Sequence, residues 1–103
     1  MSVLIEFSIF PMDRGESVSP DVAEVIRMIR DSGAEYRLTP MGTIIETATI
    51  GEALAFVERA HALLEARGCG RIYATAKIDS RAGRRGGLEG KVAAVRNRLD
   101  AGA

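Results

Sequence analysis

Apolar residues recur with two different periods along the chain, and each period predicts a different kind of element. A period of two, typical of half-buried strands, covers the first ten residues and the segment from Arg71 to Asp79. Helical spacing covers three segments, from about Pro20 to Ser32, from Gly51 to about Arg67, and after Gly87. The positions that carry these patterns are Val3, Ile5, Phe7 and Ile9 in the first strand, Val22, Val25, Ile26 and Ile29 in the first helix, Leu54, Val57, Ala60 and Leu64 in the second, and Leu88, Val92, Val95 and Leu99 in the third.

The boundaries of these elements carry turn and capping residues. Ser19 is expected to cap the first helix, with Pro20 at its first helical position, and Gly33 to end it. Pro40-Met41-Gly42 separates a short strand, Tyr36 to Thr39, from a β-branched run, Thr43 to Ile50. This pattern predicts a hairpin.

The predicted order is β-α-β-β-α-β with one further helix, in a single domain over residues 1–103. This order belongs to the α+β class. It is the ferredoxin-like arrangement, a four-stranded antiparallel sheet with both crossover helices on one face. The first and third strands are expected at the centre, with the fourth beside the first and the second beside the third.

The other sheet face is left open by this arrangement. Strand alternation places Glu6, Glu46 and Lys77 on it. Apolar side chains surround these charges, among them Leu4, Phe10, Ile44 and Tyr73. Such a mixture favours an interface or a ligand pocket, and a wet polar face is the alternative. Carboxylates there can accept hydrogen bonds from an amino group. The modest core of one small domain also favours a homo-oligomer.

The composition of the chain limits the classes of partner that it is expected to bind. The 14 basic and 14 acidic residues give no net charge, which argues against non-specific binding to nucleic acid or a membrane. The start of the chain lacks the pattern of a signal peptide, and no apolar stretch is long enough to span a bilayer. The single cysteine, Cys69, cannot form an internal disulfide and is interpreted as a buried thiol. We therefore expect a cytoplasmic protein.

Residues for catalysis are sparse. His61 is the only histidine, so neither a Cys/His metal cluster nor a well-supported nucleophilic triad is present, and no phosphate-binding or dinucleotide motif occurs. We expect no metal, no cofactor and no enzyme, with Glu6 or Glu46 as a general base the remaining enzymatic alternative. The basic segment Arg81 to Gly87, with Arg84 and Arg85, is either a solvated loop or a holder of a ligand phosphate.

Three segments together resemble the thiamine-binding protein family. They are Ser17-Val18-Ser19-Pro20, the run from Thr39 to Glu46, and Lys77-Ile78-Asp79-Ser80-Arg81. The resemblance spans nearly the whole chain in the right order. It implies the ferredoxin-like fold, assembly into dimers or tetramers through the sheets, and binding of thiamine or its hydroxymethylpyrimidine moiety without catalysis.

The resemblance also implies a set of ligand-binding residues. Together with the open-face carboxylate Glu6, they are Ser17, Ser19, Met41, Gly42, Thr43, Glu46, Lys77 and Asp79. Lys77 and Asp79 can instead pair structurally. Thr43 and Glu46 are three apart, so they can share a site only if Thr43 belongs to the turn or a bulge follows Gly42. The expected role is a carrier, buffer or sensor, and an oligomerisation module without a ligand is the alternative.

Overall fold

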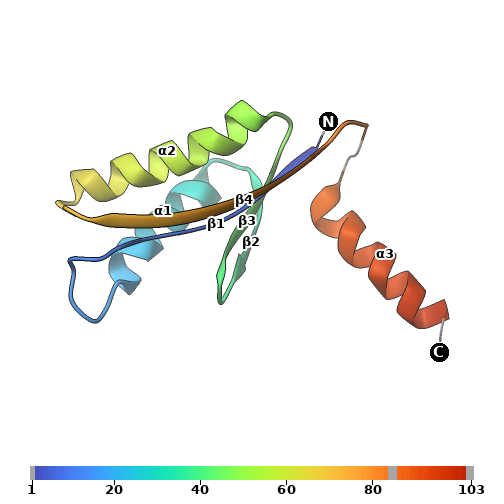
Figure 1. The fold of residues 1–103 in the computed structure, drawn as a ribbon, viewed down its shortest axis with the longest axis horizontal. Coiled ribbons are helices and arrows are strands. Elements are labelled where there is room, and N and C mark those ends of the chain that lie inside the picture. Colours follow the sequence, from blue (N-terminus) through green and yellow to red (C-terminus); the bar gives the residue numbers. More distant parts are fainter. Residues whose placement is uncertain (1, 84–85, 102–103) are drawn as a thin grey trace.

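The computed structural model describes residues 2–83 and 86–101. Figure 1 shows its strands and helices in the order that the sequence predicts. They are β1 (Ser2–Pro11), α1 (Ser19–Asp31), β2 (Glu35–Thr39), β3 (Gly42–Thr47), α2 (Ile50–Ala66), β4 (Ile72–Arg81) and α3 (Gly87–Ala101). The α+β class and the C-terminal helix are therefore confirmed.

The strands form one antiparallel sheet in the order β2-β3-β1-β4. β1 and β3 are central, as predicted for a ferredoxin-like sheet. Along β1 and β3 the pairing is regular, from Val3 opposite Thr47 to Phe7 opposite Thr43. β1 also pairs with β4 over its whole length, with Ser2 opposite Arg81. β1 therefore holds the sheet together.

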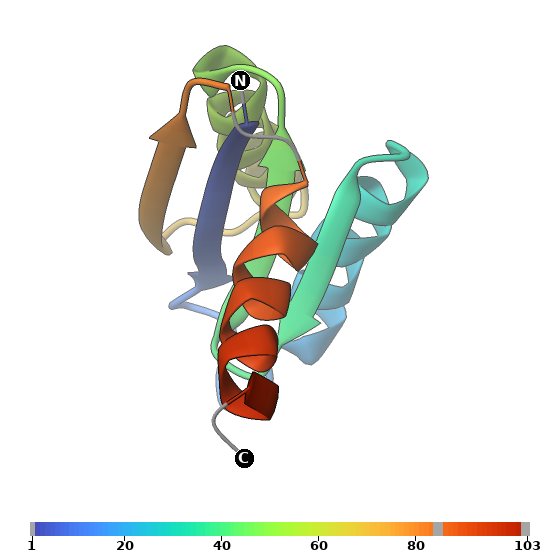
Figure 2. The same ribbon diagram turned by 90° about the vertical axis from the view of Figure 1, so that its right-hand side faces the viewer.

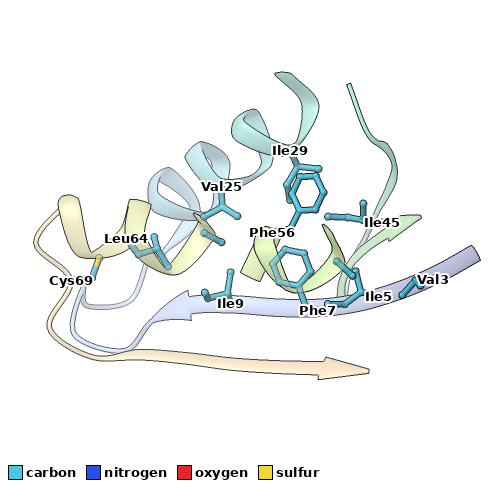
Figure 3. Packing of buried hydrophobic residues seen from close by; sticks show 12 residues of the cluster. Val3, Ile5, Phe7, Ile9, Val25, Ile29, Ile45, Phe56, Leu64 and Cys69 are labelled. Atoms are coloured by element: carbon cyan, nitrogen blue, oxygen red, sulfur yellow. The ribbon is translucent and has the colours of Figure 1, made fainter. Parts of the chain in front are cut away.

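The helix-facing side of β1 forms the centre of the core. Its four alternating apolar residues are all buried, as the period of two predicts. In Figure 3 these side chains point toward the helices. The largest partners there are Val25 and Ile29 of α1, Ile45 of β3, and Phe56 and Leu64 of α2. Burying each large apolar side chain contributes about 1.5–3 kcal/mol, so this layer is the main source of stability.

Two helix starts differ from the sequence prediction. The residue that caps α1 is Val18 and not Ser19, because the Val22 N–H already donates to the Val18 carbonyl (3.0 Å). No side chain caps this end among the described residues. α2 begins at Ile50, and its cap is Thr49, whose hydroxyl accepts from the Glu52 N–H (3.1 Å).

The buried stripe of α2 was predicted correctly at Ala60 and Leu64 but one position late in its first half. Leu54 is 49% exposed, and the buried positions are Ala53, Phe56, Ala60 and Leu64. This stripe brings the Phe56 ring into the core, while Val57 packs at its margin. The small residues Ala53 and Ala60 let the helix approach the sheet closely. A search for large aliphatic residues overlooks Ala53.

The outer elements are less covered than the centre. The helix-facing residues of β4 include Ala74 and Ala76, and both are exposed because α2 lies mainly over β1 and β3. α3 is anchored by Leu88 and then extends away from the sheet (Figures 1 and 2). The radius of gyration, 15.5 Å, exceeds the roughly 13 Å expected of a compact chain of this length.

Candidate ligand-binding site

A small cavity lies between α1, the end of β1 and the turn that joins β2 to β3. Its volume is about 190 Å³, and we call it the turn cavity. Its walls are mostly apolar, and the hydroxyl residues Thr39 and Thr43 are part of them. The apolar lining includes Phe7, Val18, Val22, Leu38 and Met41. Three of the predicted ligand-binding residues, Met41, Gly42 and Thr43, therefore meet at one place.

The turn itself is held by Thr39. Its hydroxyl accepts hydrogen bonds from the N–H groups of Met41 (3.2 Å) and Gly42 (3.1 Å), and it donates to the Gly42 carbonyl (2.8 Å). Gly42 is needed because a Cβ there would lie 3.0 Å from the carbonyl oxygen of Phe7. The edge of the cavity is thus a rigid turn pressed against β1. The sequence motif contained Thr39 but gave it no role.

Thr43 contributes a buried hydroxyl group to the wall of the cavity. It lies on the helix-facing side of β3, and only 5% of it is exposed. Within the described part of the chain no hydrogen bond reaches its hydroxyl, although it lines the cavity. A hydroxyl on the wall of a cavity can donate a hydrogen bond to a ligand or accept one from it.

A larger groove of about 510 Å³ continues from the turn cavity along α1 and the edge strand β2. We call it the α1 groove. Residues that line both spaces are Val18, Val22, Ile26 and Leu38, so the two are adjacent, and together we call them the cleft. Ser19, another predicted ligand-binding residue, lines the groove. Ser17 lies in the exposed loop just before it and lines neither space.

Glu46 lies on the opposite face of the sheet from Thr43. The regular pairing of β1 and β3 contains no bulge between these residues, so one subunit does not present both side chains to one small ligand. The Glu46 carboxylate accepts from the backbone N–H groups of Gly87 (2.9 Å) and Leu88 (3.1 Å) and from the Ser2 hydroxyl (2.8 Å). It therefore caps the first turn of α3.

Glu6, Lys77 and Asp79 lie together on the open face. Glu6 and Lys77 are directly opposite each other on β1 and β4 and form an ion pair of 3.0 Å, with the Lys77 side chain 83% exposed. Asp79 forms an ion pair with Lys91 of α3. These contacts hold α3 and neighbouring strands together. Arg81 ends β4, and Arg84 and Arg85 of the predicted basic loop lie outside the described residues.

A larger cavity, about 640 Å³, lies at the other end of the sheet from the turn. Glu46, Glu52 and Phe56 line it. Both carboxylates already accept backbone hydrogen bonds, Glu52 from the Ala48 N–H (3.1 Å). The turn cavity is smaller, but it holds the unpaired hydroxyl and the predicted motif, and we place the candidate site there.

A polar network missed by the sequence analysis fixes the loop between β1 and α1. Asp21 is buried and forms an ion pair with Arg67 at the end of α2 (2.8 Å). Arg14 donates to the Cys69 sulfur (3.4 Å) and to the carbonyl of Arg67. The hydrogen bond to Cys69, and the charge of that sulfur when ionised, raise the pKa of the Arg14 guanidinium. The network ties the loop that leads to Val18, at the edge of the cleft. Cys69 is buried, as predicted.

Other kinds of site find no support in the described ranges. Residues 2–83 and 86–101 contain no cluster of three or more side chains suited to a metal ion. Across the same ranges, no helix is long and apolar enough to cross a membrane. His61 is on the surface, where Nδ1 lies 3.1 Å from a carboxylate oxygen of Glu65.

The fold and the cavity define a ferredoxin-like domain with a space between helix, sheet and hairpin that is large enough for one ring. A sequence profile of the thiamine-binding proteins matches residues 5–96. The chain belongs to the thiamine-binding protein family, as the sequence motifs indicated.

Relatives resemble it over nearly their whole length. A UPF0045 protein of Mycobacterium bovis is 41% identical over 99 residues, which are 96% of each chain. The crystal structure of a hypothetical protein from Methanocaldococcus jannaschii has a TM-score of 0.78 at 29% identity, with 91% of this chain and 95% of that one covered. A Thermotoga maritima structure, described as a candidate protein of thiamine biosynthesis or salvage, shares the fold at 22% identity, with a TM-score of 0.78 and 92% and 99% coverage.

Proposed function

We propose that this chain binds thiamine or its hydroxymethylpyrimidine moiety without catalysing a reaction, as a carrier, buffer or sensor. The observation that carries the proposal is the unpaired, buried hydroxyl of Thr43 in a family whose profile is that of thiamine-binding proteins. A pyrimidine ring offers nitrogen acceptors and an amino donor at its edge and flat apolar faces, which suit a hydroxyl in an apolar cavity.

The size of the cleft supports the same ligand class. The turn cavity accommodates a single ring, and the α1 groove leaves room for a second ring or a substituent. Taken together they fall in the range of about 300–1,000 Å³ that is usual for small-molecule sites. We propose Ser19, Met41, Gly42 and Thr43 as the contacts, with Ser17 at the entrance.

The other predicted contacts have a structural use in the described chain. Glu46 caps α3, and Glu6, Lys77 and Asp79 form ion pairs on the open face. We propose that these four residues position α3 and the open face rather than the ligand in the turn cavity. Because the Glu6 and Glu46 carboxylates already form these contacts, we propose a binding role for the chain rather than catalysis with either carboxylate as a general base.

We further propose that the protein acts as a dimer or tetramer in the cytoplasm. An apolar stripe on α3 supports self-association, because Val92, Val95 and Leu99 are all exposed in one subunit. The cytoplasmic location rests on the single cysteine, Cys69, which hydrogen-bonds Arg14 as a free thiol.

Thr43→Val tests the binding site with nearly no change of shape. The variant removes one hydrogen bond to the ligand, which is worth about 0.5–1.5 kcal/mol, so thiamine or hydroxymethylpyrimidine should bind about 2- to 12-fold more weakly. Isothermal titration calorimetry measures this. The melting temperature should stay the same or rise, because an unpaired buried hydroxyl is replaced by a methyl group.

Thr75→Val is the matched control, since Thr75 carries the same hydroxyl on the exposed β4. It should bind like the wild type. Wild-type affinity in Thr43→Val would place the ligand elsewhere, and an absence of binding of either compound to the wild type would refute the proposed function.

A further inference from the structure

The described charged side chains that line the cleft are all basic. Among the described residues that line the turn cavity and the α1 groove, none is acidic and two are basic, Arg27 and Arg30. They are three residues apart on α1, so both point to the same side of the helix. A cleft for a purely cationic ligand would be expected to show the opposite sign.

The N-terminus of α1 is separate from these arginines. It lies at Val18, nine residues or about 13.5 Å along the helix axis before Arg27, and Asp21 in the first turn offsets its dipole. The arginines are therefore the source of positive charge at their end of the cleft, and the buried Thr43 hydroxyl shows where the uncharged part of a ligand is recognised.

We propose that the ligand of this cleft is a phosphate monoester, with its ring in the turn cavity and its phosphate held by Arg27 and Arg30. This inference rests on the proposed function and specifies the chemical form of the ligand. Thiamine carries a permanent positive charge on its thiazolium ring, and a phosphate on the same molecule offsets it. The bidentate guanidinium is well suited to phosphate oxygens.

The spacing along α1 fits such a molecule. Val22 lines both spaces, and Arg27 follows it by five residues, which is about 7.5 Å along a helix axis. A flexible arginine side chain adds to this reach. A phosphate on a ring substituent, or at the end of a two-ring ligand, can therefore lie at the arginines while the ring stays at Thr43.

The arginines keep donors for an incoming anion. Arg27 contacts Glu24 through Nη1, and Arg30 contacts Asp31 through Nε (3.0 Å). Neither carboxylate lines the cleft. Both arginine side chains are more than half exposed, and each guanidinium has further N–H groups to offer.

Two matched pairs of probes test the proposal by calorimetry: thiamine with thiamine monophosphate, and hydroxymethylpyrimidine with its phosphate. Each phosphate ester should bind about tenfold tighter than its parent, because a charge-assisted hydrogen bond increases affinity by about this factor. The advantage should shrink between 0.1 M and 1 M salt, where the screening length falls from about 10 Å to about 3 Å. Inorganic phosphate alone serves as a further probe.

The variant Arg27→Gln/Arg30→Gln should abolish the advantage of the esters while the parents bind as before. Arg81→Gln removes the same charge at the end of β4 and should leave the advantage intact. The proposal is overturned if ester and parent bind equally, if the advantage survives in the double variant, or if inorganic phosphate alone binds as tightly as the esters.

These outcomes separate this inference from the proposed function. If the parents bind and Thr43→Val weakens them, but the phosphate gives no gain, the binding function stands and the phosphate assignment is wrong. If none of the four compounds binds, the proposed function is wrong and the present inference falls with it.

Discussion

Gly42 shows how much of the candidate site depends on single backbone contacts. Its side-chain position faces the backbone of Phe7, and a Cβ there would approach the carbonyl oxygen to 3.0 Å. Backbone cannot rotate out of the way as a long side chain can, so the start of β3 must move. Because Gly42 lies directly between the Thr39 clamp and Thr43, that movement would distort the turn cavity.

We therefore expect Gly42→Ala to lower the free energy of unfolding by about 1–3 kcal/mol, the usual cost of forcing extra atoms into a packed site. Urea denaturation followed by circular dichroism measures it. Gly90→Ala is the control, because an added Cβ there meets nothing within 4 Å and the residue is in an exposed helix. It should stabilise the chain by about 0.5–1 kcal/mol. Equal effects of the two substitutions would contradict this explanation.

At the same scale, sequence reasoning found the residues of the turn but not their roles. The motif identified Met41, Gly42 and Thr43, and strand alternation correctly warned that Thr43 and Glu46 point to opposite faces. The function of Glu46 as a cap could not be foreseen, because its partners Gly87 and Leu88 come 41 and 42 residues later. Only the folded chain brings them together.

Elements were predictable where one residue type dominated a face. The period of two on β1 predicted its buried side correctly, because β-branched and aromatic residues alternate with polar ones. In α2 the second half of the stripe, Ala60 and Leu64, was predicted correctly. In the first half the large Leu54 was favoured, but the small Ala53 beside it is the buried residue. The start of α1 was one residue off, since backbone bonding at Val18 replaced the expected serine cap.

The contact between Glu46 and α3 is the clearest test at the level of an element. Glu46→Gln keeps the shape but removes the charge that faces two N–H groups and a helix dipole. We expect a loss of stability of about 0.5–2 kcal/mol, typical of a helix cap, and ligand affinity within about twofold of the wild type. Thermal denaturation and calorimetry on the same sample measure both.

The control is Glu52→Gln, which alters the charge at the start of α2, where Thr49 still caps the helix. Its effect on stability should be smaller. If Glu46→Gln instead loses ligand binding with its melting temperature unchanged, Glu46 is a ligand contact, as the family resemblance implied.

For the whole molecule, the decisive feature is the unequal covering of the sheet. Two helices bury one face, while α3 is anchored only at its start and leaves Val92, Val95 and Leu99 exposed. One subunit therefore exposes more apolar surface than its compact part requires. A second copy is the occupant we propose for this stripe.

Analytical ultracentrifugation should show a dimer or tetramer at micromolar concentration rather than the 11.1 kDa monomer. Val95→Asp should shift the equilibrium toward monomer, because a charge in an apolar interface is costly. Asn97→Asp adds the same charge to α3 outside the stripe and should leave the assembly intact. A monomeric wild type, or an assembly that survives Val95→Asp, would show that the stripe is not the interface.

The pairing of β1 with β4 also bears on how the chain is made. Ser2 pairs with Arg81, which is synthesised 79 residues later. At an elongation rate of about 5–20 residues per second, several seconds pass before the partner strand has been synthesised. During that time one edge of the central strand is open to pairing with neighbouring nascent chains. The first strand of this sheet is thus completed by the last, and its protection during synthesis depends on the helices and β3 that are made in between.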